Sequence, residues 1–225
     1  KEAMRSVKPG LYEYQLEAIS EYVFKRGGSE YPAFPSIVGS GPNSIVLHYS
    51  ENRRKMENGD LVVIDIGAEY HGYAADVTRT IPVNGKFTGE QKRIYEIILR
   101  AQKQAITAIK PGVPFRDIHK VAKKTIEEAG YGKYFSHGTS HYLGLDAHDV
   151  GDYGALQPGM VITVEPGIYI PEGSDLDKAY WNIGIRIEDD VLVTEDGYKI
   201  LSDKAPKEID DIEKLMKEEK GWSIF

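Results

Sequence analysis

Acidic residues occur inside the most apolar stretches of this chain. Asp65 and Asp76 lie in "VVIDIGAEYHGYAADVTRT", a strand-like run that covers residues 62–80. Glu165 lies in "VITVEPGIYI" and Glu188 in "NIGIRIEDDVLV", which are equally apolar. Carboxylates are rarely buried unless they are paired with a cation or bind a metal ion. These four side chains are therefore the first candidates for chemistry.

The spacing of the two aspartates predicts that they face each other across a hairpin. A turn centred on Tyr70-His71 places Asp65 directly opposite Asp76. A turn centred one residue later makes them diagonal neighbours. In both registers the two side chains lie about 5–8 Å apart on the same face of the strand pair.

The two glutamates repeat this arrangement later in the chain. A loop centred near Leu176-Asp177 places Glu165 opposite Glu188 on a second strand pair. An Asp/Asp pair followed by a Glu/Glu pair, each on a strand pair that follows helical sequence, indicates an internal duplication. The solvent-facing alternative, in which the carboxylates are ordinary surface groups, has to assume the same coincidence twice.

Four like charges on core strands require strong cationic partners. Arg186 lies two residues before Glu188 and is expected on the same strand face, but one arginine cannot neutralise four carboxylates. A pair of divalent cations can. Oxygen-rich ligation without sulfur favours Mn²⁺, with Co²⁺, Fe²⁺ and Zn²⁺ as alternatives. Paired ions of this kind lie about 3.5–4 Å apart and activate a water molecule.

A histidine-rich stretch could add a nitrogen ligand. "FSHGTSHYLGLDAHDVGD" contains His137, His141 and His148, which are half of the six histidines. The intervening Gly, Ser, Thr and Asp residues predict an irregular loop. The spacing alone does not choose among the three histidines. A zinc-binding HExxH helix is excluded, because Gly138 stands where the glutamate is required.

The apolar spacing predicts the elements that must position these residues. Helices are expected over residues 11–25, from the capping pair Thr88 and Gln91 to Pro111, over 115–129 and over 207–220; strands are expected as two short ones within 36–50, two within 62–80, and one each at 160–170 and 183–194. No linker or low-complexity segment divides them. We therefore expect one α+β domain over residues 1–225.

Composition narrows the class of protein. The 225 residues carry a net charge of −7 and no basic stripe, which argues against nucleic acid as a partner. No apolar run of about 18 residues predicts a membrane span. The absence of cysteine excludes disulfides, thiolate metal sites and a cysteine nucleophile, and favours a cytoplasmic location. The chain begins with Lys1, so it can be part of a longer protein.

The ordered set Asp, Asp, His, Glu, Glu, together with "HGTSHYLGLDAHDVG", "TVEPGIY" and "GIRIEDD", closely resembles the pita-bread metallopeptidases. Within this family the motifs are most similar to the Xaa-Pro aminopeptidase branch, and next to the Xaa-Pro dipeptidases. The resemblance covers nearly the whole chain. It implies a pseudo-twofold, curved antiparallel sheet flanked by helices. It also implies that the separate N-terminal domain usual in the family is absent from this chain.

The resemblance implies a role for each matching residue. Two divalent metal ions would be bound by Asp65, Asp76, His141, Glu165 and Glu188. Asp76 and Glu188 would bridge the ions, and Glu165 would also accept a proton. His48 and His148 would contact substrate and stabilise the tetrahedral intermediate. His137 would line the pocket for proline, with Tyr169 and Arg186 as further substrate-site residues.

The implied activity is removal of the N-terminal residue from small peptides with proline in the second position, by an enzyme that could act as a homodimer. An Xaa-Pro dipeptidase is the nearest alternative. A methionine aminopeptidase is less favoured, because the sequence shows no recognisable signature of a methionine-binding pocket. A non-catalytic binding relative would be expected to have lost metal ligands, and a creatinase-like hydrolase does not need them, whereas this chain retains all five.

Overall fold

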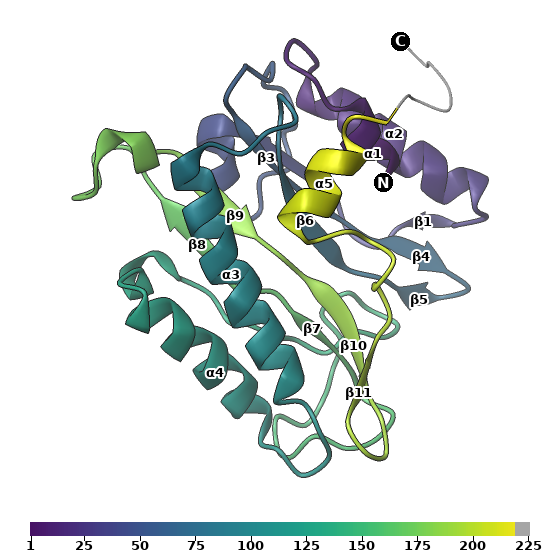
Figure 1. Cartoon of the computed structure of the whole chain (residues 1–225). Helices are drawn as coiled ribbons and strands as arrows, with labels where there is room; N and C mark the ends of the chain where they lie inside the picture. Colours follow the sequence, from purple (N-terminus) through teal and green to yellow (C-terminus); the bar gives the residue numbers. More distant parts are fainter. Residues whose placement is uncertain (219–225) are drawn as a thin grey trace.

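The computed structural model describes residues 1–218 (Figure 1). The helices are α1 (Glu2–Ser6), α2 (Glu13–Arg26), α3 (Gly89–Thr107), α4 (Phe115–Glu128) and α5 (Ile209–Leu215), with short 3-10 helices η1 (Gly41–Ile45), η2 (Gly132–Tyr134) and η3 (Lys178–Tyr180). The strands are β1 (Tyr31–Pro32), β2 (Ile37–Ser40), β3 (Leu61–Ile66), β4 (Ala68–Tyr70), β5 (Tyr73–Ala74), β6 (Val77–Pro82), β7 (Val161–Val164), β8 (Gly167–Ile170), β9 (Ile183–Arg186), β10 (Asp189–Val193) and β11 (Tyr198–Ile200).

The strand pairs of the two halves lie against one another under a helical layer. The first half contains the sheet β2-β3-β6 and the small sheet β1-β4-β5, and the second contains β8-β9 and β11-β10-β7. Every strand pair in the described residues is antiparallel. Figure 1 shows α3 and α4 side by side over one face of the strands, and α3 contacts β7, β8 and β9.

The longest helix, α3, forms as the sequence predicts. Thr88 and Gln91 make both hydrogen bonds of a capping box, which satisfies two donors at the start of the helix. Ile94, Ile98 and Ile106 follow helical spacing and are buried against the strands. The helices expected at 11–25 and 115–129 are also confirmed as α2 and α4.

One of the two strands expected within residues 36–50 is wrong. Ile37–Ser40 forms β2, but the chain then turns into η1 instead of a second strand. Pro42 lies in the first turn of η1, where its missing N–H costs nothing. The Ser44 hydroxyl donates to the Gly41 carbonyl and closes the turn. The helix expected at 207–220 is shorter, because α5 covers Ile209–Leu215, and residues 219–220 lie outside the described range.

The aspartate hairpin adopts the second of the two registers. β3 and β6 pair with Asp65 opposite Thr78, so Asp76 is the diagonal neighbour. The turn is His71-Gly72, and both residues have positive φ angles, 52° and 81°, as a two-residue type I′ turn requires. The expected placement of both aspartates on one side of the hairpin is confirmed.

The two apolar runs of the second half are each broken, and the expectation of one continuous strand in each is wrong. β7 and β8 are separated by Glu165-Pro166, and β9 and β10 are separated by Ile187-Glu188. Proline has no N–H to donate, so the ladder cannot continue through Pro166. One register nevertheless runs through both breaks, with Val164 opposite Asp189 and Gly167 opposite Arg186. Glu165 therefore lies opposite Glu188, as the spacing predicts.

Two buried threonines of β6 join the halves. Thr80 Oγ1 donates to the carbonyl of Arg186 and accepts from its N–H, at 2.9 and 3.1 Å. The N–H of Glu188 donates to the carbonyl of Thr78 at 3.1 Å. These bonds fix the Asp-bearing strand pair next to the Glu-bearing one. Among residues 1–218 no helix is both long and apolar enough to cross a membrane.

Candidate metal centre and substrate cavity

A cavity of about 540 Å³ opens where the two halves meet. It is lined by nine of the ten residues that the sequence singles out: Asp65, Asp76, His141, Glu165, Glu188, His48, His137, His148 and Arg186. The tenth, Tyr169, is buried and hydrogen-bonds both His137 and Arg186. Residues between positions 48 and 188, from both halves of the chain, thus converge on one space.

The carboxylates and one histidine form a tight cluster at one side of this cavity. Ligand atoms of Asp76, His141 and Glu188 all lie within 4.8 Å of one another. His141 Nε2 is 3.5 Å from Asp76 Oδ2 and 3.6 Å from Glu165 Oε1. The sequence left three histidines open, and the structure brings His141 among the carboxylates.

The orientation of the His141 ring suits a metal ligand. Its Nδ1 lies 3.0 Å from the Tyr142 carbonyl, which can only accept a hydrogen bond, so Nδ1 carries the proton. In the neutral ring Nε2 then presents a lone pair toward Asp76 and Glu165. A backbone carbonyl that fixes the tautomer in this way is typical of metal-binding histidines.

Two oxygens of the cluster have no partner within the described residues. Asp65 Oδ1 and Asp76 Oδ1 are buried and accept no hydrogen bond. A buried acceptor left unsatisfied costs about 1–3 kcal/mol, and more when it is charged. A divalent cation between the carboxylates would satisfy both. The donor set of carboxylate oxygens with one imidazole therefore fits hard or borderline divalent ions.

The crowding of the carboxylates disturbs their titration. Burial raises the pKa of Asp76 to about 6, and the charge of Asp65 adds to the effect. Burial raises the pKa of Glu165 to about 7 and the pKa of Glu188 well above its usual range. Without a cation these groups cannot all ionise near neutral pH. This agrees with the expectation from the sequence that four carboxylates on core strands require cationic partners.

Arg186 partly compensates this charge. It is 4% exposed, and its Nη2 lies 2.5 Å from Asp65 Oδ2. Its Nη1 donates to the Tyr169 hydroxyl at 2.9 Å and its Nε to Thr78 Oγ1 at 3.1 Å. The Thr78 hydroxyl donates in turn to Glu188 Oε2 at 2.7 Å. Burial lowers the pKa of Arg186, but Tyr169 and Asp65 outweigh it, so the net pKa is raised and the guanidinium stays charged.

His137 is held as a neutral ring in the cavity wall. Its Nδ1 donates to the Gly138 carbonyl at 2.7 Å, so its Nε2 accepts from the Tyr169 hydroxyl at 2.9 Å. Burial, together with the positive charge of Arg186, lowers the pKa of His137 to about 4. The ring is therefore an uncharged aromatic surface at neutral pH.

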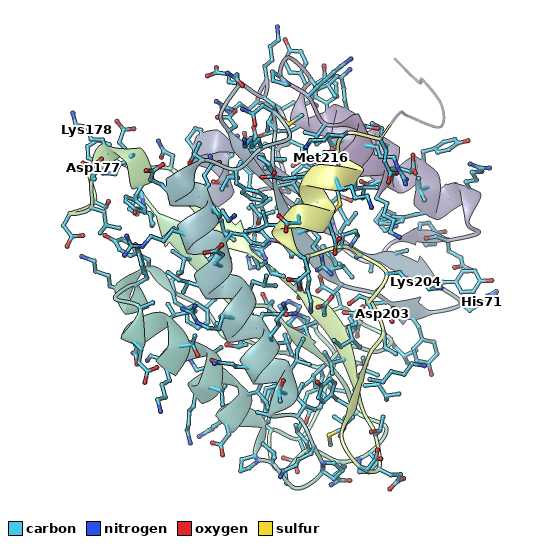
Figure 2. The ribbon with its side chains drawn as sticks, in the orientation of Figure 1. His71, Asp177, Lys178, Asp203, Lys204 and Met216 are labelled. Carbon is cyan, nitrogen blue, oxygen red and sulfur yellow. The ribbon has the colours of Figure 1, made fainter. Side chains whose placement is uncertain are left out.

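The other histidines divide between the cavity and the periphery. The His148 ring stacks on the His141 ring with centroids 4.0 Å apart, and partial burial lowers the pKa of His148. His48 is exposed at the cavity rim. His71 is at the outer edge of the molecule, at the tip of the β4–β5 hairpin (Figure 2). His119 lies on α4, with its Nδ1 2.9 Å from Thr139 Oγ1.

Sequence reasoning missed two residues that hold the candidate ligands Asp76 and Glu188. Thr78 supports Glu188, as described above. Asp190 Oδ2 accepts from the Asp76 N–H at 3.2 Å, and burial raises the pKa of Asp190 to about 7. A run of three acidic residues in an apolar strand was the available signal for Asp190. Period-2 alternation would have placed Thr78 on the face of Asp76.

The fold and the site together define a class of protein. Residues 1–195 match metallopeptidase family M24, and the chain belongs to this family. The resemblance seen in the sequence and the expected pita-bread fold are confirmed.

Individual relatives narrow the comparison. The chain is 46% identical over 237 residues to the Xaa-Pro aminopeptidase of Haemophilus influenzae. The alignment covers 95% of this chain and 55% of the relative. The chain is 36% identical over 275 residues to the Xaa-Pro dipeptidase of Homo sapiens, covering 96% of this chain and 55% of the relative. The solved structure of Pseudomonas aeruginosa aminopeptidase PepP superposes with a TM-score of 0.92 at 42% identity, covering 95% of this chain and 54% of the other. The chain thus spans about half the length of these relatives.

Proposed function

We propose that this chain carries the catalytic site of an Xaa-Pro aminopeptidase, which removes the N-terminal residue from peptides with proline in the second position. The observation that carries the proposal is that Asp65, Asp76, Glu165, Glu188 and His141 line one cavity. Two buried carboxylate oxygens there have no hydrogen-bond partner among residues 1–218. The similarity to an Xaa-Pro aminopeptidase over 95% of the chain supports the substrate class.

In the proposed site, Asp65, Asp76, His141, Glu165 and Glu188 hold two divalent metal ions, with Asp76 and Glu188 shared between them. Mn²⁺ is the proposed native metal, because oxygen donors dominate the site and sulfur is absent. When bound, the ions supply a Lewis acid and lower the pKa of an attacking water molecule.

The protein side chains then move protons and stabilise charge. Glu165 accepts a proton from the attacking water and returns it to the proline nitrogen as the peptide bond breaks. His148 and His48 face the cavity and donate hydrogen bonds to the carbonyl oxygen as it gains negative charge.

The neutral His137 ring is the proposed surface for the proline side of the substrate. A pyrrolidine ring is apolar and packs favourably against an uncharged aromatic face. Tyr169 and Arg186 hold that face through the bonds described above. A dipeptide substrate carries its C-terminal carboxylate on the proline. The positive charge of the buried Arg186 would favour that carboxylate near the His137 ring.

A second candidate is an Xaa-Pro dipeptidase. The 36% identity to the human dipeptidase supports it. The residues that line the cavity are compatible with a dipeptide as well as with a longer peptide. A cytoplasmic location and a homodimer complete the proposal. Fractionation of cells and the mass of the protein in solution test these two statements.

The decisive experiment compares matched Xaa-Pro dipeptides and Xaa-Pro-Yaa tripeptides, with metal removed and with Mn²⁺ restored. Mn²⁺-dependent cleavage of the tripeptide, absent for a tripeptide without proline and lost in Asp76→Ala, supports the aminopeptidase. Preference for the dipeptide moves the assignment to the dipeptidase. If the folded, metal-loaded protein cuts neither peptide, the proposal fails for this chain.

A further inference from the structure

His48 reaches the cavity on a connection that has little regular structure. Residues 46–60 link η1 to β3, and Leu47, His48 and Ser50 from this segment line the cavity. Backbone hydrogen bonds tie residues 52–56 to residues 10–14, but within the described chain none holds residues 47–51. A stretch with few hydrogen bonds opens locally at low free energy. A side chain that must meet a reacting oxygen within a few tenths of an ångström therefore needs support from outside its own segment.

That support comes from a buried carboxylate at the start of α2. Glu13 is 0% exposed. Five donors from four residues on both sides of His48 point at its two oxygens: Oε1 accepts from Ser40 N at 2.7 Å, Ser40 Oγ at 2.7 Å and Asn43 Nδ2 at 3.1 Å, and Oε2 accepts from Tyr49 OH at 2.9 Å and Arg54 N at 2.8 Å.

The bond from Tyr49 is the one nearest to His48. Within residues 1–218, the Tyr49 hydroxyl provides the only hydrogen bond that ties residues 47–51 to an element outside residues 41–54. The same hydroxyl accepts from the Arg53 N–H at 3.3 Å. The Glu13 carboxylate thus fixes the position next to His48. Its bond from the Arg54 N–H adds to the backbone bond that the Glu13 N–H donates to the Arg54 carbonyl.

A simpler explanation is that Glu13 only stabilises α2. An acidic residue in the first turn of a helix is favourable, but an exposed carboxylate suffices for this effect. Among the described residues, every donor to the Glu13 carboxylate comes from residues 40–54 and none from α2. The bonds are directed at the segment that carries His48.

We propose that Glu13 is a positioning residue: it holds residues 40–54 so that His48 faces the carboxylate cluster across the cavity. The effect on catalysis rests on the proposed function, whereas the effect on the position of the segment does not. A carboxylate is required, because all five partners are donors and an ionised carboxylate only accepts. Glu13→Gln keeps the size of the side chain but places an NH₂ donor opposite a group that can only donate, such as the Arg54 N–H.

The test is a double-mutant cycle on the metal-loaded chain with Glu13→Gln, His48→Ala and both together. We expect Glu13→Gln alone to lower kcat about 10-fold, and His48→Ala to lower it about 100-fold, the loss typical of one removed oxyanion donor. In the His48→Ala background we expect Glu13→Gln to change kcat less than about two-fold, because both changes remove the same interaction. An equal loss in both backgrounds would overturn the proposal.

Hydrogen exchange gives a readout that does not depend on activity. We expect Glu13→Gln to accelerate amide exchange in residues 41–54 about 10-fold and to leave exchange in α3 and β10 unchanged. Glu17→Gln, one turn along α2 and half-exposed, is the matched control and should change neither kcat nor exchange. Unchanged protection of residues 41–54 in Glu13→Gln would contradict the inference even if activity fell.

Tyr49→Phe is the milder variant if Glu13→Gln does not fold. It removes one of the five bonds and should give a smaller effect of the same kind in both readouts. If the wild-type chain shows no peptidase activity, the proposed function fails, and the exchange measurement still decides whether Glu13 holds the segment.

Discussion

Asp76 is the residue at which stability and the proposed function conflict most directly. Its carboxylate lies among Asp65, Glu165 and Glu188, one of its oxygens has no partner in the described chain, and burial raises its pKa to about 6. A carboxylate in such a place is unfavourable for the metal-free fold and useful only when a cation is present.

Asp76→Asn should therefore raise the stability of the metal-free protein and lower its affinity for metal. The metal-free protein should melt a few degrees higher, since about 1 kcal/mol shifts Tm by roughly 2–4 °C in a domain of this size. Affinity for Mn²⁺ should fall by more than about 100-fold, the upper loss seen when even an outer partner of a ligand is removed. Calorimetry measures both quantities. Asp203→Asn, an exposed control outside the helices and strands, should change neither, and a lower metal-free Tm for Asp76→Asn would refute the argument.

The Tyr169 hydroxyl is a second residue-scale test. It accepts from Arg186 and donates to His137, so Tyr169→Phe leaves a buried donor and a buried acceptor unpaired. We expect a loss of about 1–3 kcal/mol in the free energy of unfolding. We also expect KM for Xaa-Pro peptides to rise more than kcat falls, because His137 loses the bond that fixes its ring.

Tyr95→Phe is the matched control for that change. Tyr95 is also buried and donates its hydroxyl to the Lys207 carbonyl at 2.9 Å, and it does not line the cavity. It should lower stability without affecting KM. Equal changes of KM in the two variants would show that Tyr169 acts only through the stability of the fold.

At the scale of elements, the sequence predicts which strand residues lie opposite each other more accurately than it predicts where a strand is interrupted. The type I′ turn at His71-Gly72 and the period-2 alternation of β3 and β6 fix one register, because a slip of one residue would turn the apolar side chains away from the core. Opposition of Glu165 and Glu188 follows in the same way. Apolar content predicts one continuous strand over residues 160–170, whereas Pro166 marks the break at Glu165-Pro166 that the structure shows.

Other features of the site could not be predicted from local pattern. The Nδ1 atoms of both His137 and His141 meet a backbone carbonyl, so the choice depends on which Nε2 meets carboxylates. His141 Nε2 faces Asp76 and Glu165, whereas His137 Nε2 meets the Tyr169 hydroxyl, and tertiary packing sets both. The replacement of a strand by η1 reflects turn chemistry around Pro42, which outweighed the apolar residues that follow.

Gly67 is an element-scale test, because it lies where the chain leaves β3 between the two aspartates. A Cβ at this position would lie 1.7 Å from the Ala75 carbonyl oxygen, which belongs to the backbone and cannot move alone. Gly67→Ala should therefore shift Asp65 relative to Asp76 and cost several kcal/mol of stability.

Gly89→Ala is the control for Gly67→Ala. At the first residue of α3 an added Cβ meets nothing within 4 Å, and alanine is the better helix former, so stability should stay equal or rise. Thermal melts compare the two variants. A Gly67→Ala protein with wild-type Tm and metal affinity would contradict the assignment of a close backbone approach.

At the scale of the whole molecule, the raised pKa values predict how the metal-free protein responds to pH. Asp76, Glu165 and Asp190 have pKa values of about 6, 7 and 7, above the 3.8–4.5 of unperturbed carboxyls. Between these limits the folded state binds more protons than the unfolded state, so stability falls as the pH rises. His137, with a pKa lowered to about 4, acts in the opposite direction up to about pH 6.5.

The net loss should therefore be clearest between about pH 6 and 7.5, measured as a falling Tm in the presence of a chelator. Mn²⁺ should abolish most of this fall, because bound cations favour the ionised carboxylates. A metal-free Tm that stays level or rises over this range would show that the cluster does not limit stability.

The shared register of the strand pairs β8–β9 and β7–β10 affects how the length of the chain can vary among homologues. Glu165 and Glu188 are held opposite each other by pairs on both sides of the break, from Val164 with Asp189 to Ile170 with Ile183. The connection at residues 171–182 lies beyond the last pair, so inserted or deleted residues there leave the two glutamates opposed, and longer loops cost little closure entropy. One residue inserted between Glu165 and Ile170 would offset them. Natural length variation in this half of the fold should therefore be concentrated at the outer end of the strands and absent from the few residues next to the glutamates.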